Sequence, residues 1–146
     1  MRFLHLSDLH LGKRVCEFSM LDDQRYILEE ILSLLDTRPV DAVLLAGDLY
    51  DKPVPPAEAV RLLDWFLTEL ADRKLPVFAI SGNHDSAERV AFGAHLLAGS
   101  QVYVSPVFEG APAPIPLTDA YGPVDIYLMP FLKPAMVGFR KDSPGT

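Results

Sequence analysis

Apolar residues follow two different patterns along this chain. Continuous apolar runs near residues 2 to 7, 41 to 46 and 76 to 81 are typical of strands buried on both faces of a parallel sheet. Between these runs, apolar residues recur every three or four positions over residues 21 to 36 and 57 to 73, which predicts two amphipathic helices. This alternation predicts an α/β fold, with a mostly parallel sheet flanked by helices.

The pattern changes in the last third of the chain. Helical spacing of apolar residues predicts one more helix from residue 87 to 98. Short β runs then follow at residues 102 to 104 and 124 to 129, around a segment rich in proline that suits edge strands and turns. Because no repeat and no flexible linker interrupts residues 1 to 146, we expect a single domain.

The helix predicted at residues 57 to 73 has more apolar surface than one sheet face requires. Leu62, Trp65 and Phe66 widen its apolar stripe. A helix deep in the core and a helix that binds a partner explain this width equally well. We expect a homodimer that pairs through this helix and the helix at residues 87 to 98.

Composition narrows the possible functions. A chain of 146 residues with 49% apolar composition can form one proper core. Its 13 basic and 20 acidic residues give a net charge of −7, which argues against binding nucleic acid through a broad positive face. Cys16 is the only cysteine, which fits a reducing compartment, and no apolar run approaches the roughly 18 residues of a membrane span. We therefore expect a cytoplasmic protein that meets any polyanion locally.

Polar residues that can bind metals follow each of the three predicted strands. Since the carboxyl ends of parallel strands meet at one edge of a sheet, these side chains should lie close together. Their carboxylate, amide and imidazole groups suit manganese, iron or zinc. Each residue alone has an ordinary structural explanation, but their coincidence at three strand ends favours a metal site. The residues are Asp8 and His10 after the first strand, Asp48 after the second, and Asn83, His84 and Asp85 after the third.

A two-metal arrangement accounts for most of these residues. A carboxylate can bridge two cations roughly 3.5 to 4 Å apart, and such a pair can clamp both oxygens of a phosphoryl displacement. Asp48 is the candidate bridge. Asp8 and His10, two positions apart on a chain leaving a strand, can bind one ion, and the amide oxygen of Asn83 can bind the other.

The neighbouring polar residues support other roles. His84 is better placed to contact a phosphate or to protonate a leaving oxygen, and Asp85 could orient its imidazole. Asp51 fits equally as a hydrogen-bond partner behind the ligands or as a solvated loop acid. Lys13 and Arg14 fit equally as contacts to a phosphate backbone or as ordinary solvated charges.

Taken together, the strand-end motifs resemble the signature of the calcineurin-like metallophosphoesterases. Over about residues 1 to 135 the chain is similar to the SbcD-type nucleases of bacterial double-strand-break repair. The resemblance implies a metallophosphoesterase sandwich fold and a dimeric DNA exonuclease and endonuclease that works with an SbcC-like ATPase subunit. The motifs that carry it are Asp8-x-His10, Gly47-Asp48-x-x-Asp51 and Gly82-Asn83-His84-Asp85.

The resemblance also assigns roles to individual residues. It implies two divalent metal ions, most often manganese in this family, bound by Asp8, His10, Asp48 and Asn83. It implies that His84 is the catalytic histidine. Two other interpretations remain open: a metallophosphoesterase acting on small phosphodiesters or phosphoproteins, and a non-catalytic module for dimerisation and docking.

One part of the family pattern is missing after Asp85. The family continues with an isolated histidine and then a Gly-His-x-His motif, and His95 comes too soon to replace either. We therefore expect the N-terminal part of a longer protein, with its sandwich truncated on the C-terminal side. We also expect the chain alone to fold, to bind manganese weakly and to cleave DNA poorly.

Overall fold

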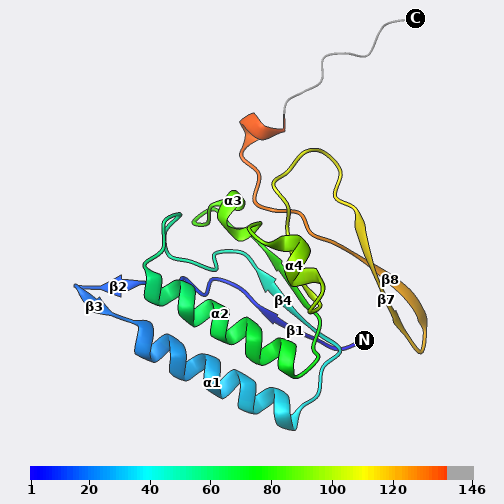
Figure 1. Cartoon of the computed structure of the whole chain (residues 1–146), viewed down its shortest axis with the longest axis horizontal. Coiled ribbons are helices and arrows are strands. Elements are labelled where there is room, and N and C mark those ends of the chain that lie inside the picture. Colours follow the sequence, from blue (N-terminus) through cyan, green and yellow to red (C-terminus); the bar gives the residue numbers. More distant parts are fainter. Residues whose placement is uncertain (138–146) are drawn as a thin grey trace, which may run out of the picture.

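A four-stranded parallel sheet forms the centre of the computed structural model, which describes residues 1–137 (Figure 1). Its strand order is β1-β4-β5-β6, so the chain adds strands one after another in a single direction across the sheet. The α/β fold and the three strands expected near residues 2 to 7, 41 to 46 and 76 to 81 are confirmed. The strands are β1 (Phe3–Leu6), β4 (Ala42–Ala46), β5 (Val77–Ile80) and β6 (Val102–Val104).

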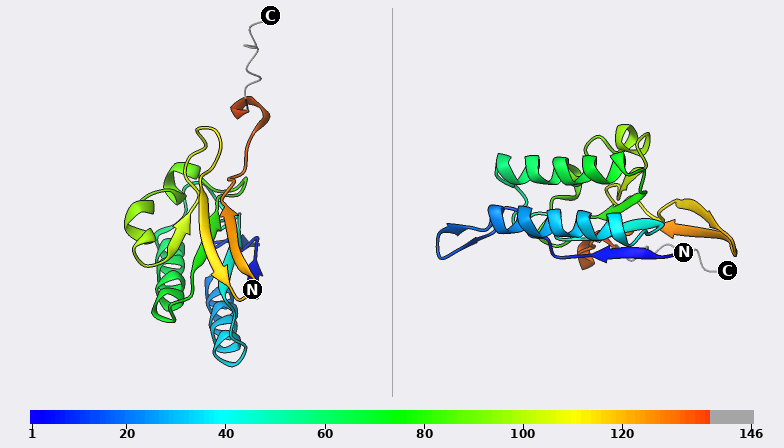
Figure 2. Two further views of the ribbon diagram at one scale, coloured as in Figure 1. Left: turned by 90° about the vertical axis from the view of Figure 1, so that its right-hand side faces the viewer. Right: turned by 90° about the horizontal axis from the view of Figure 1, so that it is seen from below.

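Two long helices cover one face of this sheet. Figure 2 shows α1 (Leu21–Thr37) and α2 (Ala57–Asp72) side by side on the same side of the strands. Both agree with their predicted bounds to within one residue. The main apolar core lies between these helices and the sheet. Each strand contributes alternate residues to it, because successive side chains of a strand point to opposite faces. The buried members of this core include Leu28, Leu32, Val43, Leu45, Leu63, Phe66, Leu70, Val77 and Ala79.

The unusual width of the α2 apolar stripe is explained within the chain. Leu62 is 5% exposed and Phe66 is 0% exposed, so both belong to the core. Trp65 is half-buried, and the guanidinium of Arg25 on α1 lies 4.3 Å from the centre of its ring. Our expectation of a partner surface is therefore wrong for Leu62 and Phe66, whereas Trp65 keeps part of its surface exposed. Because α2 packs against both the sheet and α1, it needs a wider stripe than a helix that covers a sheet alone.

Our prediction of one helix from residue 87 to 98 is also wrong, because the chain forms two short helices there. These are α3 (Ala87–Val90) and α4 (Ala94–Ala98). Gly93 lies between them with a φ of 73°, a left-handed conformation that interrupts an α-helix. The break leaves two large apolar side chains, Phe92 and Leu96, each 85% exposed.

A separate hairpin covers part of the other face of the sheet. It consists of β7 (Pro114–Asp119) and β8 (Gly122–Tyr127), so the last strand begins and ends two residues earlier than expected. Apolar residues of the hairpin pack with Leu128 against this face, where the rings of Phe78 and Tyr103 stack at 5.2 Å. The ammonium group of Met1 also lies 2.6 Å from Asp119 Oδ2, which ties the hairpin to the start of β1.

Three smaller features complete the described part of the chain. A hairpin of β2 (Arg14–Val15) and β3 (Phe18–Ser19) projects beside the N-terminal end of α1 (Figure 1). A short 3₁₀ helix, η1, spans Pro134–Met136. Within residues 1–137, none of the helices is both long and apolar enough to cross a membrane. Residues 138–146 of the expected domain lie outside the described part.

Candidate metal centre

The ends of β1, β4 and β5 bring the predicted ligands to one place. Asp8, Asp48 and Asn83 line a single hollow of about 300 Å³. Their convergence, which the sequence predicts, is confirmed. The same hollow is also lined by Met129, Pro130 and Phe131, which follow β8.

Three of the proposed site residues adopt a left-handed backbone conformation. The φ angles are 55° for Asp8, 43° for His10 and 49° for Asp48. Non-glycine residues rarely adopt this conformation, and it persists only where surrounding contacts impose it. Here the N–H of Asp8 donates to the carbonyl of Gly47 at 3.2 Å, and that of His10 donates to the carbonyl of Asp48 at 2.9 Å. The two loops therefore hold each other in shape beyond the ends of their strands.

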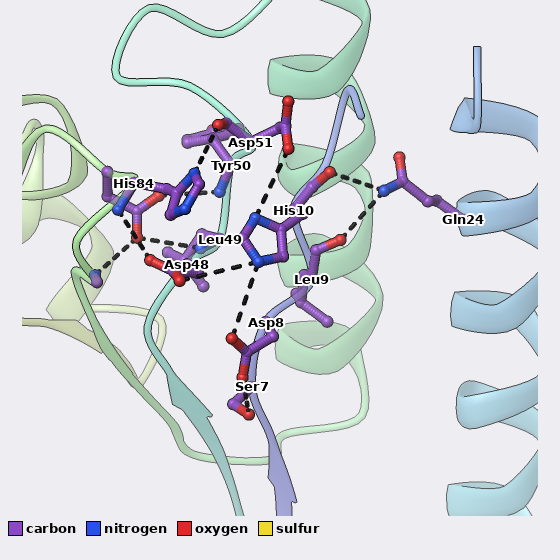
Figure 3. A network of polar contacts seen from close by, with 12 residues as sticks. Ser7, Asp8, Leu9, His10, Gln24, Asp48, Leu49, Tyr50, Asp51 and His84 are labelled. Carbon is purple, nitrogen blue, oxygen red and sulfur yellow. Dashed lines mark hydrogen bonds and ion pairs between the residues drawn. The ribbon is translucent and has the colours of Figure 1, made fainter. Parts of the chain in front are cut away.

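His10 lies between three carboxylates (Figure 3). Its Nε2 is 3.8 Å from both Asp8 Oδ1 and Asp48 Oδ2, which is too far for a hydrogen bond. Two ligand atoms each about 2.1 Å from one cation lie about 3 to 4.2 Å apart, so His10 can share a divalent ion with either carboxylate. The donor set is therefore suitable for a metal.

The other ring nitrogen of His10 faces Asp51. This Nδ1 is buried and has no hydrogen-bond partner among residues 1–137. The nearest carboxylate oxygen, Asp51 Oδ1, is 3.7 Å away. Histidines that bind metals are commonly oriented by a carboxylate on their second nitrogen. Of the two interpretations of Asp51, the geometry favours a partner behind the ligands over a solvated acid.

His84 is tied to both of the acids that follow β4. The backbone N–H of His84 donates to Asp48 Oδ1 at 2.9 Å, and the Nδ1 of its ring lies 3.0 Å from the carbonyl oxygen of Asp51. Since a carbonyl can only accept, the Nδ1 carries a proton, and in the neutral imidazole the lone pair is then on the Nε2. One ligand atom from each of His10, Asp48 and His84 lies within 4.8 Å of the others. His84 can therefore reach a metal or a substrate near Asp48.

Asp85 has a different partner from the one expected. Its carboxylate accepts the backbone N–H groups of Leu49 at 3.0 Å, Tyr50 at 2.9 Å and Gly82 at 2.8 Å. The predicted contact with the imidazole of His84 is wrong, because three convergent donors satisfy this carboxylate. By accepting these three N–H groups, Asp85 joins the two loops that carry Asp48 and Asn83. Its charge also affects Tyr50: burial, and secondarily the charges of Asp85 and Asp64, raise the pKa of the Tyr50 hydroxyl to about 12.

Two glycines allow these two loops to approach each other closely. Gly47 has a φ of 88°, and a side chain built on it would lie 3.0 Å from the Cα of Gly82. A side chain on Gly82 would overlap the backbone nitrogen and Oδ1 of Asp48. The positions of Asp48 and Asn83 therefore depend on the absence of side chains at residues 47 and 82.

Gln24 is a site residue that sequence reasoning missed. Its amide nitrogen donates to the carbonyls of Leu9 at 3.1 Å and His10 at 2.8 Å, and its oxygen accepts the N–H of Gly12 at 3.1 Å (Figure 3). Gln24 thus holds the loop that carries the first pair of ligands. One signal was present in the sequence: Gln24 lies three residues after Leu21 and four before Leu28, on the apolar face of α1.

The two cations of the first loop lie away from the hollow. Lys13 and Arg14 are exposed, and neither lines it. Arg14 donates instead to the carbonyl of Glu17 across the β2–β3 hairpin. Their local environment fits the interpretation as solvated charges better than direct contact with a phosphate at the metal site.

This chain belongs to the calcineurin-like phosphoesterase family, whose model matches residues 1–132. Among curated proteins, it is 34% identical over 132 residues to the SbcD component of the SbcCD nuclease from Staphylococcus saprophyticus subsp. saprophyticus. It is 35% identical over 132 residues to the protein of the same name in Staphylococcus epidermidis. Each alignment covers 90% of this chain and 34% of the relative, so the chain spans about a third of their length. The predicted family resemblance is confirmed.

Proposed function

We propose that this chain is part of the catalytic domain of a metal-dependent DNA nuclease that hydrolyses phosphodiester bonds. The observation that carries the proposal is the convergence of Asp8, Asp48 and Asn83 on one hollow, with His10 and His84 beside Asp48. The names of the staphylococcal relatives support a nuclease component that works with a second protein. By analogy, we propose an SbcC-like ATPase partner, a role in double-strand-break repair and a cytoplasmic location.

We propose that the site holds two divalent ions, most readily Mn²⁺. Asp8 and His10 would bind one ion, Asn83 would bind the other, and Asp48 would bind both. Asp48 can do so although its Oδ1 accepts the backbone N–H of His84, because a carboxylate oxygen that accepts one N–H retains a second lone pair. When bound, the ions would polarise the phosphodiester and supply a nucleophilic hydroxide. The protein fixes the directions of these ligands through the left-handed turns at Asp8, His10 and Asp48.

His84 would act on the substrate from beside Asp48. Its Nδ1–H is held by the carbonyl of Asp51, so its Nε2 is the atom that can contact the phosphate or, once protonated, give a proton to the leaving oxygen. Asp51 would position both histidines, with its carbonyl directed to His84 and its carboxylate to His10. Asp85 would contribute by holding the loops rather than by touching the substrate.

Activity on different phosphodiesters tests the proposal. The full-length natural protein, loaded with manganese, should cleave supercoiled or hairpin DNA in a chelator-sensitive manner. Asp48→Asn should abolish cleavage and weaken metal binding, whereas His84→Gln should abolish cleavage and retain metal. Glu30→Gln, at an exposed position on α1, is the matched control and should change neither.

Two other outcomes would support the competing functions. Rapid hydrolysis of a small chromogenic phosphodiester with intact DNA would favour an enzyme for small phosphodiesters or phosphoproteins. Wild-type protein that forms its complex without hydrolysing any phosphodiester would favour a docking module.

We further propose that residues 1–146 alone bind manganese weakly and cleave DNA poorly. The sequence has four histidines, and His5 and His95 are exposed on β1 and α4 rather than lining the hollow. Water would have to complete the coordination of each ion. Isothermal titration of the chain should show weak binding, and two tightly bound ions with robust nuclease activity would contradict this.

Finally, we propose a homodimer that pairs through α2, α3 and α4. An apolar groove of about 430 Å³ lies between these helices, with Val60, Phe92 and Leu96 exposed along it. A second copy of the chain would bury these side chains. Phe92→Glu with Leu96→Glu should convert the dimer to a monomer in sedimentation experiments. Tyr121→Glu, which alters a still more exposed residue of the β7–β8 hairpin, should leave the mass unchanged.

A further inference from the structure

Part of the hollow at the metal centre is apolar. After the buried Leu128, the chain leaves the core and presents Met129 and Phe131, which are 44% and 46% exposed. Both line the same hollow as Asp8 and Asp48. The proposed hydrolysis requires only polar groups, so these two large apolar side chains call for another function.

The apolar segment is firmly attached to the loop that carries Asn83. The N–H of Phe131 donates to the carbonyl of Ser81 at 2.8 Å, and the N–H of Ser81 donates to Ser105 Oγ at 3.1 Å. Ser81 and Ser105 are almost fully buried. Because Ser81 precedes Asn83 by two residues, this network fixes Phe131 relative to a proposed metal ligand.

The charge of the chain limits how a nucleotide can be held here. The net charge is −7, and no lysine or arginine among the described residues lines the hollow. The proposed metal ions would attract the reacting phosphate, but they offer nothing to the base beside it. An aromatic face can instead bind any nucleobase by stacking, regardless of sequence. A hollow of about 300 Å³ is at the lower end for small ligands and suits one nucleotide unit rather than a duplex.

We propose that Phe131, with Met129 beside it, stacks on the base of an unpaired nucleotide next to the phosphodiester that is cleaved. The inference rests on the proposed nuclease function and adds a substrate requirement to it, namely a base beside the reacting phosphate. Stacking by Phe131 retains the nucleotide, while the polar side of the hollow acts on the phosphate.

A substrate without bases isolates this contribution. The full-length natural protein is given a fluorescent single-stranded trinucleotide and its analogue with three abasic tetrahydrofuran residues. Binding is measured by anisotropy and hydrolysis by KM and kcat. Phe131→Leu should raise Kd and KM about tenfold for the trinucleotide and leave both unchanged for the abasic analogue. Phe131→Tyr, which keeps the ring, should behave as wild type. Phe18→Leu makes the same change at an exposed residue of the β2–β3 hairpin, so it is the matched control and should change neither quantity.

The two measurements separate this inference from the nuclease proposal. Equal effects of Phe131→Leu on both ligands, or no effect on either, would overturn the stacking role even if the wild type is an active nuclease. Binding that depends on the base and on Phe131, without any hydrolysis, would retain the stacking role and overturn the nuclease function. Circular dichroism of each variant checks that it is folded.

Discussion

The loop after β1 and the pair of loops after β4 and β5 carry ligands to the same sheet edge, but they are held by different chemistry. The first loop presents two carbonyls and one N–H to Gln24, an amide on the neighbouring helix α1. The other two loops direct three N–H groups to the carboxylate of Asp85, which belongs to the third motif itself. Gln24 can both donate and accept, as the first loop requires, whereas the carboxylate of Asp85 only accepts, as the three N–H groups require.

This difference indicates that the two parts of the site depend on different regions of the molecule. The loops of Asp48 and Asn83 are joined by a residue within their own motif and by the contact between Gly47 and Gly82. The loop of Asp8 and His10 depends on the packing of α1. A change in one holding group should therefore disturb one set of ligands more than the other, and the experiments below test this separation.

Gly82→Ala should have the largest effect of the substitutions considered. The added methyl group would overlap the backbone nitrogen and Oδ1 of Asp48, and backbone cannot yield as a flexible side chain can. We expect a loss of about 3 kcal/mol in the free energy of unfolding, at the upper end for overpacking, together with loss of metal binding. Urea unfolding and manganese titration measure the two effects.

Gly99→Ala is the control for the change at Gly82. Gly99 ends α4 with a φ of −62°, and its new methyl group would meet only the carbonyl oxygen of Leu96 at 3.3 Å. Stability and metal binding should therefore remain close to those of the wild type. Metal binding by Gly82→Ala that equals the wild type would show that the two loops tolerate separation.

Asp85→Asn should have the next largest effect. An asparagine keeps one oxygen acceptor but turns an amino group toward at least one of the three N–H groups, so a buried donor is left unpaired. We expect a loss of about 2 kcal/mol in unfolding free energy and weaker metal binding. If Asp85 instead oriented His84, as the sequence suggested, kcat would fall while the urea midpoint stayed constant. That result would contradict the holding role.

The regular parts of the fold could be predicted from the sequence because their signals are local. Long apolar runs and helical spacing identified β1, β4 and β5 and both long helices to within a few residues. The break at Gly93 was missed because an isolated glycine in a helical pattern is often tolerated, so its left-handed conformation could not be foreseen. The β2–β3 hairpin turns at Cys16 and Glu17, which lack the usual turn signals, although both have positive φ angles.

The site could be predicted only as far as its motifs extend. Asp8, Asp48 and Asn83 lie at strand ends, so the parallel sheet alone implies that they meet. The partners of Asp85 could not be predicted, because they are backbone groups whose directions depend on two loops folding together. Gln24 was visible only as a polar residue on an apolar face, a pattern that also fits a residue at the edge of the core.

Gln24→Leu should have a moderate effect that is confined to the first loop. Leucine fills a similar space but leaves two carbonyls and the N–H of Gly12 without their partner. We expect a loss of about 1 to 2 kcal/mol in unfolding free energy. Manganese affinity should fall by roughly tenfold, as for other residues that orient metal ligands. Glu30→Ala, on the exposed side of α1, is the control and should change neither quantity.

The separation between the two parts of the site can then be read by NMR. In Gln24→Leu, chemical-shift changes should be centred on residues 8 to 12, and those around Asn83 should be small. In Asp85→Asn the reverse is expected. Equal shifts at both places in both variants would show that the loops form one cooperative unit, which would remove the distinction drawn here.

The smallest effect is expected from an ion pair between the two helices, far from these loops. Arg73 on the C-terminal end of α2 contacts Asp36 of α1 at 2.9 Å, and its hydrogen bond holds the pKa of that carboxyl below the ordinary 3.8. A carboxyl with a lowered pKa stabilises the fold at pH values above 3.8, and this contribution disappears as the pH falls through the lower pKa of the folded state. The contribution is small because Asp36 is exposed and the pair is screened by solvent.

Asp36→Asn should therefore lower the melting temperature slightly at about pH 6, and the difference from wild type should vanish in strong acid. Manganese affinity measured at the same pH should be unchanged, since neither helix end contacts the loops that bear the ligands. A fall in affinity as large as that of Gln24→Leu would show that any loosening of α1, and not the three hydrogen bonds of Gln24, governs the first loop.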